Sequence, residues 1–436
     1  MRTLALLVLA AAALCACGEV AKLPENATWG PDPQLGEIQK RLIPTVNIAD
    51  ATGWPQGAQP TAAAGWRVTP FATGLTHPRW VVVLPNGDVL VAESNKPQPP
   101  PGEKEKHGIK AFFMKMFMKK AGAGVPSADR ITLLRDADGN GVAETKTVLI
   151  DGLKSPFGMA LVGEVLYIAN ADAIVKVPFK PGATRIDARP EKVADLPAGI
   201  NHHWTKNILA SRDGSKLYAT VGSNSNIGEN GMDIEEGRAA IWEVDVASGR
   251  KRLFAGGLRN PNGLAWEPTS GALWTVVNER DELGSDLVPD YLTSVQDGAF
   301  YGWPWSYWGR NVDERVKPAN PQKVAAAKSP DYALGNHVAP LGLAFAEGRL
   351  PAPYASGAFV GEHGSWNRKP FAGYKVVFIP FEGGKPKGLP QDFLTGFLSA
   401  DGKAYGRPVG VAVDARRGVL VADDVGNAIW RVAPAQ

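Results

Sequence analysis

One short phrase recurs six times along this chain, and the recurrence limits the folds that the chain can adopt. Each copy has an X-Pro or short polar opening, an apolar strand, a turn at Gly or Asn-Gly, and a second strand rich in Val, Leu, Tyr or Trp. Regular repeats of a strand pair indicate units that pack only on their neighbours. We therefore predict an all-β, six-bladed β-propeller with one copy in each blade. The copies span residues 77–93, 155–169, 203–220, 260–276, 339–361 and 407–422.

The length of the chain also favours a repeat architecture. A single hydrophobic core stops growing at about 250–300 residues, so most of a 436-residue chain needs either two domains or a ring of units. A propeller must close to protect its strand edges, and we expect residues 66–71 to share a blade with residues 428–432. An array of β-sandwiches would also show short strands, but it does not explain the repeated opening phrase.

The first seventeen residues have the pattern of an export signal. Arg2 supplies the positive charge, residues 4–14 are an apolar run, and Cys17 follows Leu14-Cys15-Ala16 as in a lipobox. An ordinary signal peptide is the alternative, but both cysteines of the chain fall here. The pattern predicts an exported protein that is lipidated at Cys17 and anchored to a bacterial membrane, facing the periplasm.

Cysteine usage and charge exclude several classes of function. The mature chain would keep at most Cys17, which excludes an internal disulfide, a zinc site built from cysteines and a C-x-x-C-H haem site. Redox chemistry would therefore need a bound organic cofactor. The net charge is +3 and the basic residues are scattered, so no basic stripe for nucleic acid is present in the sequence.

Composition and spacing divide the chain into three parts. Residues 1–17 are the predicted signal peptide, residues 18–65 are rich in Pro, Ala and Gly and predict a flexible tether, and residues 66–436 form the propeller. Two of the intervals between copies are long, which predicts insertions at residues 95–128 and 282–335. The first insertion contains an apolar, basic run at 109–120 that predicts a short helix. We favour a cap over the propeller to a docking surface, because the apolar residues are not confined to one face.

Two copies have unusual openings that place chemistry at the end of the channel. The run NHHWTKN at 201–207 puts two histidines before an apolar strand, and alternation allows only His202 or His203 to point into the channel. An imidazole is well suited to take a proton from a sugar hydroxyl. A structural histidine is the alternative interpretation at this point.

Cations open or close several of the later copies. Arg259 and Asn260 precede the fourth strand pair, Arg368 and Lys369 follow the fifth, and Arg407 opens the sixth. Converging cations at a channel mouth predict a small polyanionic ligand, because a guanidinium binds carboxylates through two parallel hydrogen bonds. No Gly-rich phosphate loop is present in the sequence, which disfavours a nucleotide.

Two acidic stretches are candidate cation sites. The loop NERDELGSD at 278–286 follows a strand and offers several carboxylates, which suits Ca²⁺ or else a solvated acidic loop. The stretch DADGNG at 136–141 begins like an EF-hand loop, but Thr147 stands where the twelfth-position glutamate belongs. We interpret that stretch as a hairpin turn.

Taken together, these phrases resemble the pyrroloquinoline quinone (PQQ)-dependent sugar dehydrogenases, and within them the sorbosone dehydrogenase-like branch. The resemblance rests on RNPNGLA at 259–265, YGWP at 301–304, HWTKN at 203–207, GSNSN at 222–226 and EHGSWNR at 362–368. It implies a six-bladed propeller with PQQ and Ca²⁺ at the channel mouth. It further implies that His203 is the catalytic base and that Arg259 is both catalytic and, with Asn260, in contact with the cofactor. Arg407 and either Arg368 or Lys369 would bind the same cofactor.

The resemblance also implies calcium ligands in the loop that begins at Glu279, with Arg280, Asp281 and Asp286 as candidates. The sequence departs from relatives there, because Arg280-Asp281 replaces a Gly-Pro pair that ligates through carbonyl oxygens. His202 likewise replaces the aspartate that precedes the base.

The expected function is the oxidation of an aldose or sugar aldehyde by hydride transfer to the quinone of PQQ. The electrons would pass to a separate acceptor, a cytochrome or a quinone. A calcium-dependent lactonase on the same fold is an alternative, and a binding propeller without catalysis is another; for the second, His203 would be dispensable.

Overall fold

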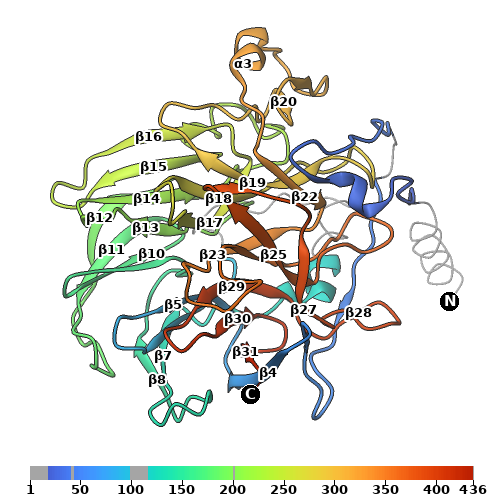
Figure 1. Cartoon of the computed structure of the whole chain (residues 1–436). Helices are drawn as coiled ribbons and strands as arrows, with labels where there is room; N and C mark the ends of the chain where they lie inside the picture. The colour runs from blue at the N-terminus through green and yellow to red at the C-terminus, as the bar shows by residue number, and fades with distance from the viewer. Residues whose placement is uncertain (1–17, 41–43, 99–115, 200–201, 436) are drawn as a thin grey trace, which may run out of the picture.

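The chain folds into a ring of six β-sheets, which confirms the predicted six-bladed propeller (Figure 1). The computed structural model describes residues 18–40, 44–98, 116–199 and 202–435. The signal peptide with Cys17 and residues 99–115 of the first insertion lie outside the described residues. Within the described part, no helix has the length and apolar character to cross a membrane.

Each blade is a four-stranded antiparallel sheet, with extra short strands added to blades 4 and 5. The strands of blades 1 to 3 are β5 (Pro78–Val83), β6 (Val89–Glu93), β7 (Arg130–Arg135) and β8 (Thr145–Ile150); β9 (Met159–Val162), β10 (Val165–Ala169), β11 (Ala173–Pro178) and β12 (Glu191–Asp195); and β13 (Ile208–Ala210), β14 (Lys216–Val221), β15 (Ala240–Asp245) and β16 (Lys251–Gly256). Those of blades 4 to 6 are β17 (Asn260–Trp266), β18 (Leu273–Asn278), β19 (Pro289–Val295) and β22 (Tyr332–Asn336); β23 (Pro340–Phe345), β24 (Gly357–Glu362), β25 (Lys375–Glu382) and β27 (Gln391–Thr395); and β29 (Pro408–Val413), β30 (Val419–Asp423), β31 (Ala428–Pro434) and β4 (Trp66–Thr73).

The ring closes by pairing strands from opposite ends of the chain. β4 joins β31 in an antiparallel register that runs from Thr73 opposite Ala428 to Trp66 opposite Pro434. The prediction that residues 66–71 and 428–432 share a blade is therefore confirmed. Closure leaves the last blade with the same four strands as its neighbours.

The hydrophobic core is divided among the faces between neighbouring blades. Six separate clusters of buried side chains each combine residues from two successive sheets. One joins Phe359 and Phe378 of blade 5 to Trp430 of blade 6, and another joins Trp80 of blade 1 to Phe157 of blade 2. The remaining four clusters fill the other interfaces. This is why a chain of this length does not need one large core.

In several copies a Gly lies two residues after the opening Pro, and it lets the first strands of neighbouring blades approach one another around the axis. A Cβ at Gly342 of β23 would lie 2.2 Å from the carbonyl oxygen of Val409 in β29. A Cβ at Gly410 would lie 2.9 Å from the carbonyl oxygen of Arg79, and one at Gly263 would lie 2.7 Å from the Cβ of Leu343. The repetition of the phrase therefore follows from backbone packing between neighbouring blades.

Residues 18–40 and 44–65 pack on the ring, which differs from the flexible tether expected from their composition. Two strands of two residues each join blade sheets: β1 (Trp29–Gly30) pairs with β22 and β3 (Thr61–Ala62) with β27. A third, β2 (Asp50–Ala51), forms a separate two-stranded sheet with β28 (Lys403–Ala404). A 3-10 helix, η1 (Glu25–Thr28), precedes β1. These contacts are too short to produce a periodic pattern. Composition therefore did not reveal them.

The second predicted insertion turns back along the outside of the ring. After β19, residues 298–303 run beside β16, where Tyr301 donates a backbone hydrogen bond to Gly256 and Trp303 donates one to Gly257. The segment then forms the hairpin β20 (Ser306–Tyr307) and β21 (Asn311–Val312) and the helix α3 (Pro321–Ala326), near the top of Figure 1. Its course brings residues 303–315 beside the candidate site.

The described end of the first insertion forms a short helical turn, η2 (Lys119–Ala123). The ammonium of Lys120 lies 2.6 Å from a carboxylate oxygen of Asp50. A Cβ at Gly122 would lie 2.9 Å from a methyl carbon of Val425 in the turn between β30 and β31. Most of the run at 109–120 lies outside the described residues, so the cap over the propeller stays a prediction.

Candidate functional site

The candidate site lies at the end of the ring where the first strand of every blade begins. We call this end the mouth. His203 precedes β13, Arg259 precedes β17, and the turns after β14 and β18 return to the same end with Ser223 and Glu279. All of the side chains predicted from the unusual openings therefore belong to loops that meet at the mouth.

The openings of four first strands share a backbone irregularity. The register with the second strand shifts directly after the opening residues of β5, β17, β23 and β29, between Pro78 and Trp80 in the first of these. Such a bulge bends the strand and re-aims the residues before it. The irregularity thus separates polar opening residues at the mouth from apolar residues that pack between blades.

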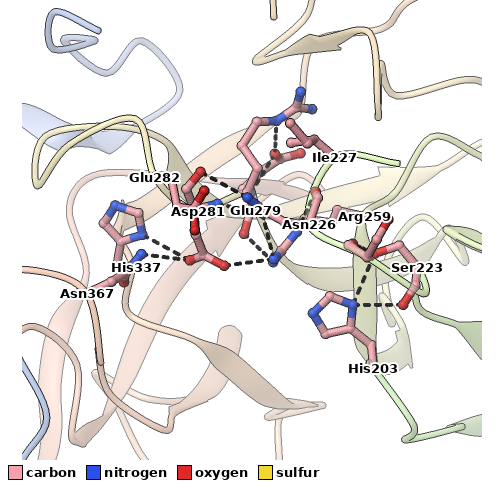
Figure 2. A network of polar contacts seen from close by, with 12 residues as sticks. His203, Ser223, Asn226, Ile227, Arg259, Glu279, Asp281, Glu282, His337 and Asn367 are labelled. Atoms are coloured by element: carbon pink, nitrogen blue, oxygen red, sulfur yellow. Dashed lines mark hydrogen bonds and ion pairs between the residues drawn. The ribbon is translucent and has the colours of Figure 1, made fainter. Parts of the chain in front are cut away.

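His203 is held by one ring nitrogen, and no hydrogen bond of the other is found among the described residues (Figure 2). Its Nδ1 lies 3.0 Å from both the carbonyl oxygen and the Oγ of Ser223. Because a carbonyl oxygen can only accept, Nδ1 carries the proton and Nε2 keeps its lone pair. Burial, followed by the charge of Arg259, lowers the pKa of His203 well below its usual value. The imidazole is therefore neutral and able to accept a proton near pH 7.

A glycine brings the side chains of His203 and Asn260 together. A Cβ at Gly222, just after β14, would lie 2.6 Å from the Cβ of His203 and 2.5 Å from Oδ1 of Asn260. Asn260 is buried, and this Oδ1 has no hydrogen-bond partner. Any larger residue at position 222 would separate the candidate base from the candidate amide.

Arg259 is fixed by a network that spans three loops (Figure 2). Its guanidinium donates to Oδ2 of Asp281 at 2.8 Å, to Oδ1 of Asn226 at 3.0 Å and to the carbonyl oxygen of Glu279. Arg259 is 3% exposed. The cation is therefore held rigidly beside His203, and its charge keeps the imidazole unprotonated.

Asp281 extends this network toward blade 5. Its Oδ1 accepts a hydrogen bond of 2.8 Å from Nδ2 of Asn367 and lies 3.8 Å from Nδ1 of His337. Asn226 also accepts from the backbone N–H of Asp281 at 2.9 Å. The sequence had marked Asp281 as a metal ligand, whereas here it is the counter-ion of Arg259.

The four residues predicted to bind calcium do not converge on one point. Glu279 accepts from Arg280, Asp281 from Arg259, and Asp286 from the backbone N–H groups of Lys22 and Leu23. Arg280 is fully buried, and its guanidinium donates to Asp313 and to the carbonyl oxygens of Pro304 and Ser306. Each carboxylate thus has a separate cationic or backbone partner, although Oε1 of Glu279 and Oδ1 of Asp286 have no hydrogen-bond partner in the described part, and the calcium assignment stays a prediction. Among the described residues the one cluster of three acids lies elsewhere, with Asp136 half-buried and Asp138 and Glu144 exposed.

The other predicted cofactor ligands differ in the hydrogen bonds that their side chains already make. Arg368 donates to the carbonyl oxygens of Ser285 and Pro370, so its guanidinium holds the loop after β18 rather than the mouth. Lys369, next in the chain, contacts that loop through its backbone N–H. Arg407 donates to His363 and Ala49, and only its Nε lacks a partner.

The sequence did not single out a second polar cluster on the opposite side of the mouth. Asp424, after β30, accepts hydrogen bonds from Arg79 at the start of β5 and from His363 after β24. The guanidinium carbon of Arg79 lies 5.9 Å from the ring centroid of Trp204, which follows His203. Arg79 stands in the opening of the first copy, so comparison of all six openings could have found it.

Several polar side chains from the openings of the blades and the loops that follow them have buried atoms without a hydrogen-bond partner in the described part of the chain. Buried atoms without a hydrogen-bond partner include Nε of Arg79, Nζ of Lys206, Oδ1 of Asn260 and Oδ1 of Asp424. They come from blades 1, 3, 4 and 6. Buried polar atoms are rarely left unpaired in folded proteins. Such atoms would be satisfied by a polar ligand that offers both donors and acceptors.

Comparisons with known proteins agree with this fold. A protein of Borreliella burgdorferi is 28% identical over 296 residues, covering 64% of this chain and 76% of that protein. The pyrroloquinoline quinone-dependent pyranose dehydrogenase of Coprinopsis cinerea is 24% identical, covering 74% of this chain, which spans 45% of its length. The calcium structure of the Trichoderma reesei AA12 enzyme superposes with a TM-score of 0.69 at 19% identity, covering 90% of this chain and 99% of that one. The model of the TrAA12-like family matches residues 119–291 and 312–435. The chain belongs to the TrAA12-like family.

Proposed function

We propose that this protein oxidises an aldose or a sugar aldehyde, such as a sorbosone-like sugar, with PQQ as hydride acceptor. A separate cytochrome or quinone would then take the electrons. The observation that carries the proposal is His203, which presents a free Nε2 at the mouth with its Nδ1 proton fixed by Ser223. Membership of the TrAA12-like family, with a PQQ-dependent dehydrogenase among the relatives, supports the same chemistry.

His203 would take the proton of the sugar hydroxyl while the C–H bond loses its hydride. The Ser223 carbonyl stabilises the Nδ1–H, and that hydrogen bond strengthens when the ring becomes imidazolium. Arg259 is placed to stabilise negative charge that develops beside the base, because Asp281 and Asn226 hold its guanidinium in one position. Both groups are pre-organised before a substrate arrives.

The residues at the mouth fit PQQ. Bound PQQ supplies an ortho-quinone that accepts a hydride, together with carboxylates that need cationic partners. Arg79 and Lys206 have buried, unpartnered donors and would hold these acceptor groups, and Asn260 adds an unpartnered amide oxygen. Burial lowers the pKa of Lys206 to about 7, and an anionic ligand would restore its charge.

We also propose Ca²⁺ as a second component of the active protein. The calcium structure of the Trichoderma reesei AA12 enzyme supports this. The carboxylates predicted as ligands are engaged elsewhere, so we assign no ligand set and route no step through the ion.

The test is to add PQQ, with and without Ca²⁺, to the purified protein and to follow reduction of a redox dye with a panel of aldoses and sorbosone. We expect dye reduction only with PQQ, and faster reduction with Ca²⁺. No dye reduction and no spectral change of the quinone with any sugar would disprove the dehydrogenase. Hydrolysis of lactones without PQQ would instead indicate the lactonase alternative.

We further propose that the protein is exported and attached to a membrane through Cys17, facing the periplasm. The support is the lipobox at residues 14–17. Cys17→Ala should move the protein from the membrane fraction to the soluble fraction in the producing bacterium. Unchanged membrane association of this variant would contradict the lipid anchor.

A further inference from the structure

A second imidazole at the mouth is oriented by a buried carboxylate. Nε2 of His363 lies 2.9 Å from Oδ2 of Asp424, and the same oxygen accepts a hydrogen bond from Arg79. His77 also approaches this oxygen, with Nε2 at 3.6 Å. The Asp424 side chain is 1% exposed. The carboxylate is thus surrounded by three nitrogen side chains from blades 1 and 5.

This arrangement fixes the proton of His363 on Nε2. Burial alone would raise the pKa of Asp424, but His363, His77 and Arg79 hold it far below its usual value. An ionised carboxylate can only accept, so the hydrogen bond places the His363 proton on Nε2 and leaves a lone pair on Nδ1. No contact of Nδ1 is found among the described residues, and the side chain is 22% exposed. Nδ1 is therefore open to solvent at the mouth.

The groups that face His363 keep its ring neutral. Burial lowers the pKa of His363 to about 4, the charge of Asp424 opposes this shift, and Arg407 and Arg79 reinforce it. Arg407 donates to the carbonyl oxygen of His363, which fixes the backbone beneath the ring. In both His203 and His363 a hydrogen bond holds one ring nitrogen, and no hydrogen bond of the other is found among the described residues.

The proposed reaction leaves one proton without an acceptor. Oxidation of a sugar carbinol releases two electrons and two protons. His203 takes the hydroxyl proton, and the hydride carries both electrons and the other hydrogen nucleus to the quinone. When a one-electron acceptor removes the two electrons, that nucleus remains as a proton and must leave the mouth. While His203 still holds the first proton, a different base must accept this one when the acceptor is a one-electron carrier.

We propose that His363, oriented by Asp424, is this second proton acceptor and takes up at Nδ1 the proton released when the reduced cofactor gives its electrons away. The proposal rests on the proposed function. His77 shares the carboxylate but cannot serve, because it is 4% exposed and its Nδ1 faces the backbone oxygen of Asp424. His77 therefore provides a matched control.

The first test needs no cofactor. The chain has six histidines, so selective ¹⁵N-histidine labelling of the whole protein gives few NMR signals. We expect His363, identified by its loss in H363Q, to show protonated Nε2 and unprotonated Nδ1 at pH 7. Its pKa should lie below 6.5. A proton on Nδ1, or a doubly protonated ring at pH 7, would overturn the proposal.

The second test separates the two halves of the cycle by stopped-flow absorbance of the PQQ-loaded protein. We expect H363Q to slow reoxidation of sugar-reduced protein by ferricenium about 10²-fold and to flatten its pH dependence, with a much smaller effect on reduction by sugar. H77Q should keep the pH dependence of reoxidation. Wild-type reoxidation kinetics in a folded H363Q would refute the role. Absence of any quinone reduction in the wild type would instead remove the proposed function, and the inference with it.

Discussion

At the scale of single residues, the chemistry depends on which nitrogen of His203 carries a proton. The backbone carbonyl of Ser223 settles this, because it can only accept and so places the proton on Nδ1. His203→Ala should therefore lower kcat by about 10²–10⁴-fold while PQQ affinity, measured by fluorescence titration, stays close to wild type. If turnover survives this change, the base has been misassigned.

Burial and the charge of Arg259 set the pH below which His203 becomes protonated and can no longer act as a base. Burial and Arg259 lower the pKa of His203, so the neutral, active form persists to lower pH than for a free histidine. Activity should fall as the pH drops through this lowered pKa. Arg259→Met removes the cation, and the acid limb of the kcat/KM profile should move to higher pH. An unmoved acid limb would mean that the limb reports a different group.

Single residues also show how far sequence reasoning reached. His203, Arg259 and Asn260 were found because they interrupt the apolar opening phrase, and the structure brings them together. Asp281 was identified as an acid, but its role as counter-ion depends on Arg259 and Asn367, which are distant in sequence. No sequence pattern marked Asp424 as a candidate site residue. Its importance comes entirely from side chains of two other blades.

At the scale of elements, the opening phrase recurs in the blades because the first strands pack closely there, and not because every copy has a catalytic role. Gly342→Ala should destabilise the protein by about 1–3 kcal/mol, because the new Cβ would lie 2.2 Å from the carbonyl oxygen of Val409. Gly256→Ala is the matched control in a strand, since its nearest neighbour would be 3.8 Å away. Urea unfolding of both variants measures the difference. Equal losses would contradict the close approach of the first strands.

Elements with a repeated pattern were predicted, and elements without one were not. The six strand pairs each carry an apolar strand and a turn, so their hairpins could be predicted. Strands β1, β2 and β3 have two residues each and depend on partners that lie far along the chain. The course of residues 296–331 could not be derived either, because its hydrogen bonds to Gly256 and Gly257 are set by tertiary structure.

At the scale of the whole molecule, the N-terminal segment is part of the folded body. Trp54 donates to Asp423 at 2.7 Å and packs on Phe397 and Trp430 between blades 5 and 6. Deletion of residues 18–65 should lower Tm by at least about 5 °C, because it removes the hydrogen bond and the aromatic contacts of Trp54 between two blades. Calorimetry of the deletion and of Trp54→Ala provides the comparison. An unchanged Tm of the deletion variant would support the interpretation of residues 18–65 as a flexible tether.

The whole-molecule predictions differ in what supports them. The propeller and its closing strand pair are confirmed, and so is the resemblance to PQQ-dependent sugar dehydrogenases. The sorbosone-like branch, the lipid anchor and the periplasmic location stay predictions. They depend on a binding pocket filled by a substrate and on residues 1–17, and neither follows from the packing of the ring.

The pairing of β4 with β31 has a consequence for synthesis. The strand β4, which completes the last blade, is made before the strands of the other five blades, whereas its partner β31 is made after them. While β31 is still inside the ribosome, the ring cannot close. The edge of β4 and the edge of β30 then stay exposed. A stop codon placed just before β31 would leave the other five blades intact and still produce an open ring that is prone to join its neighbours edge to edge.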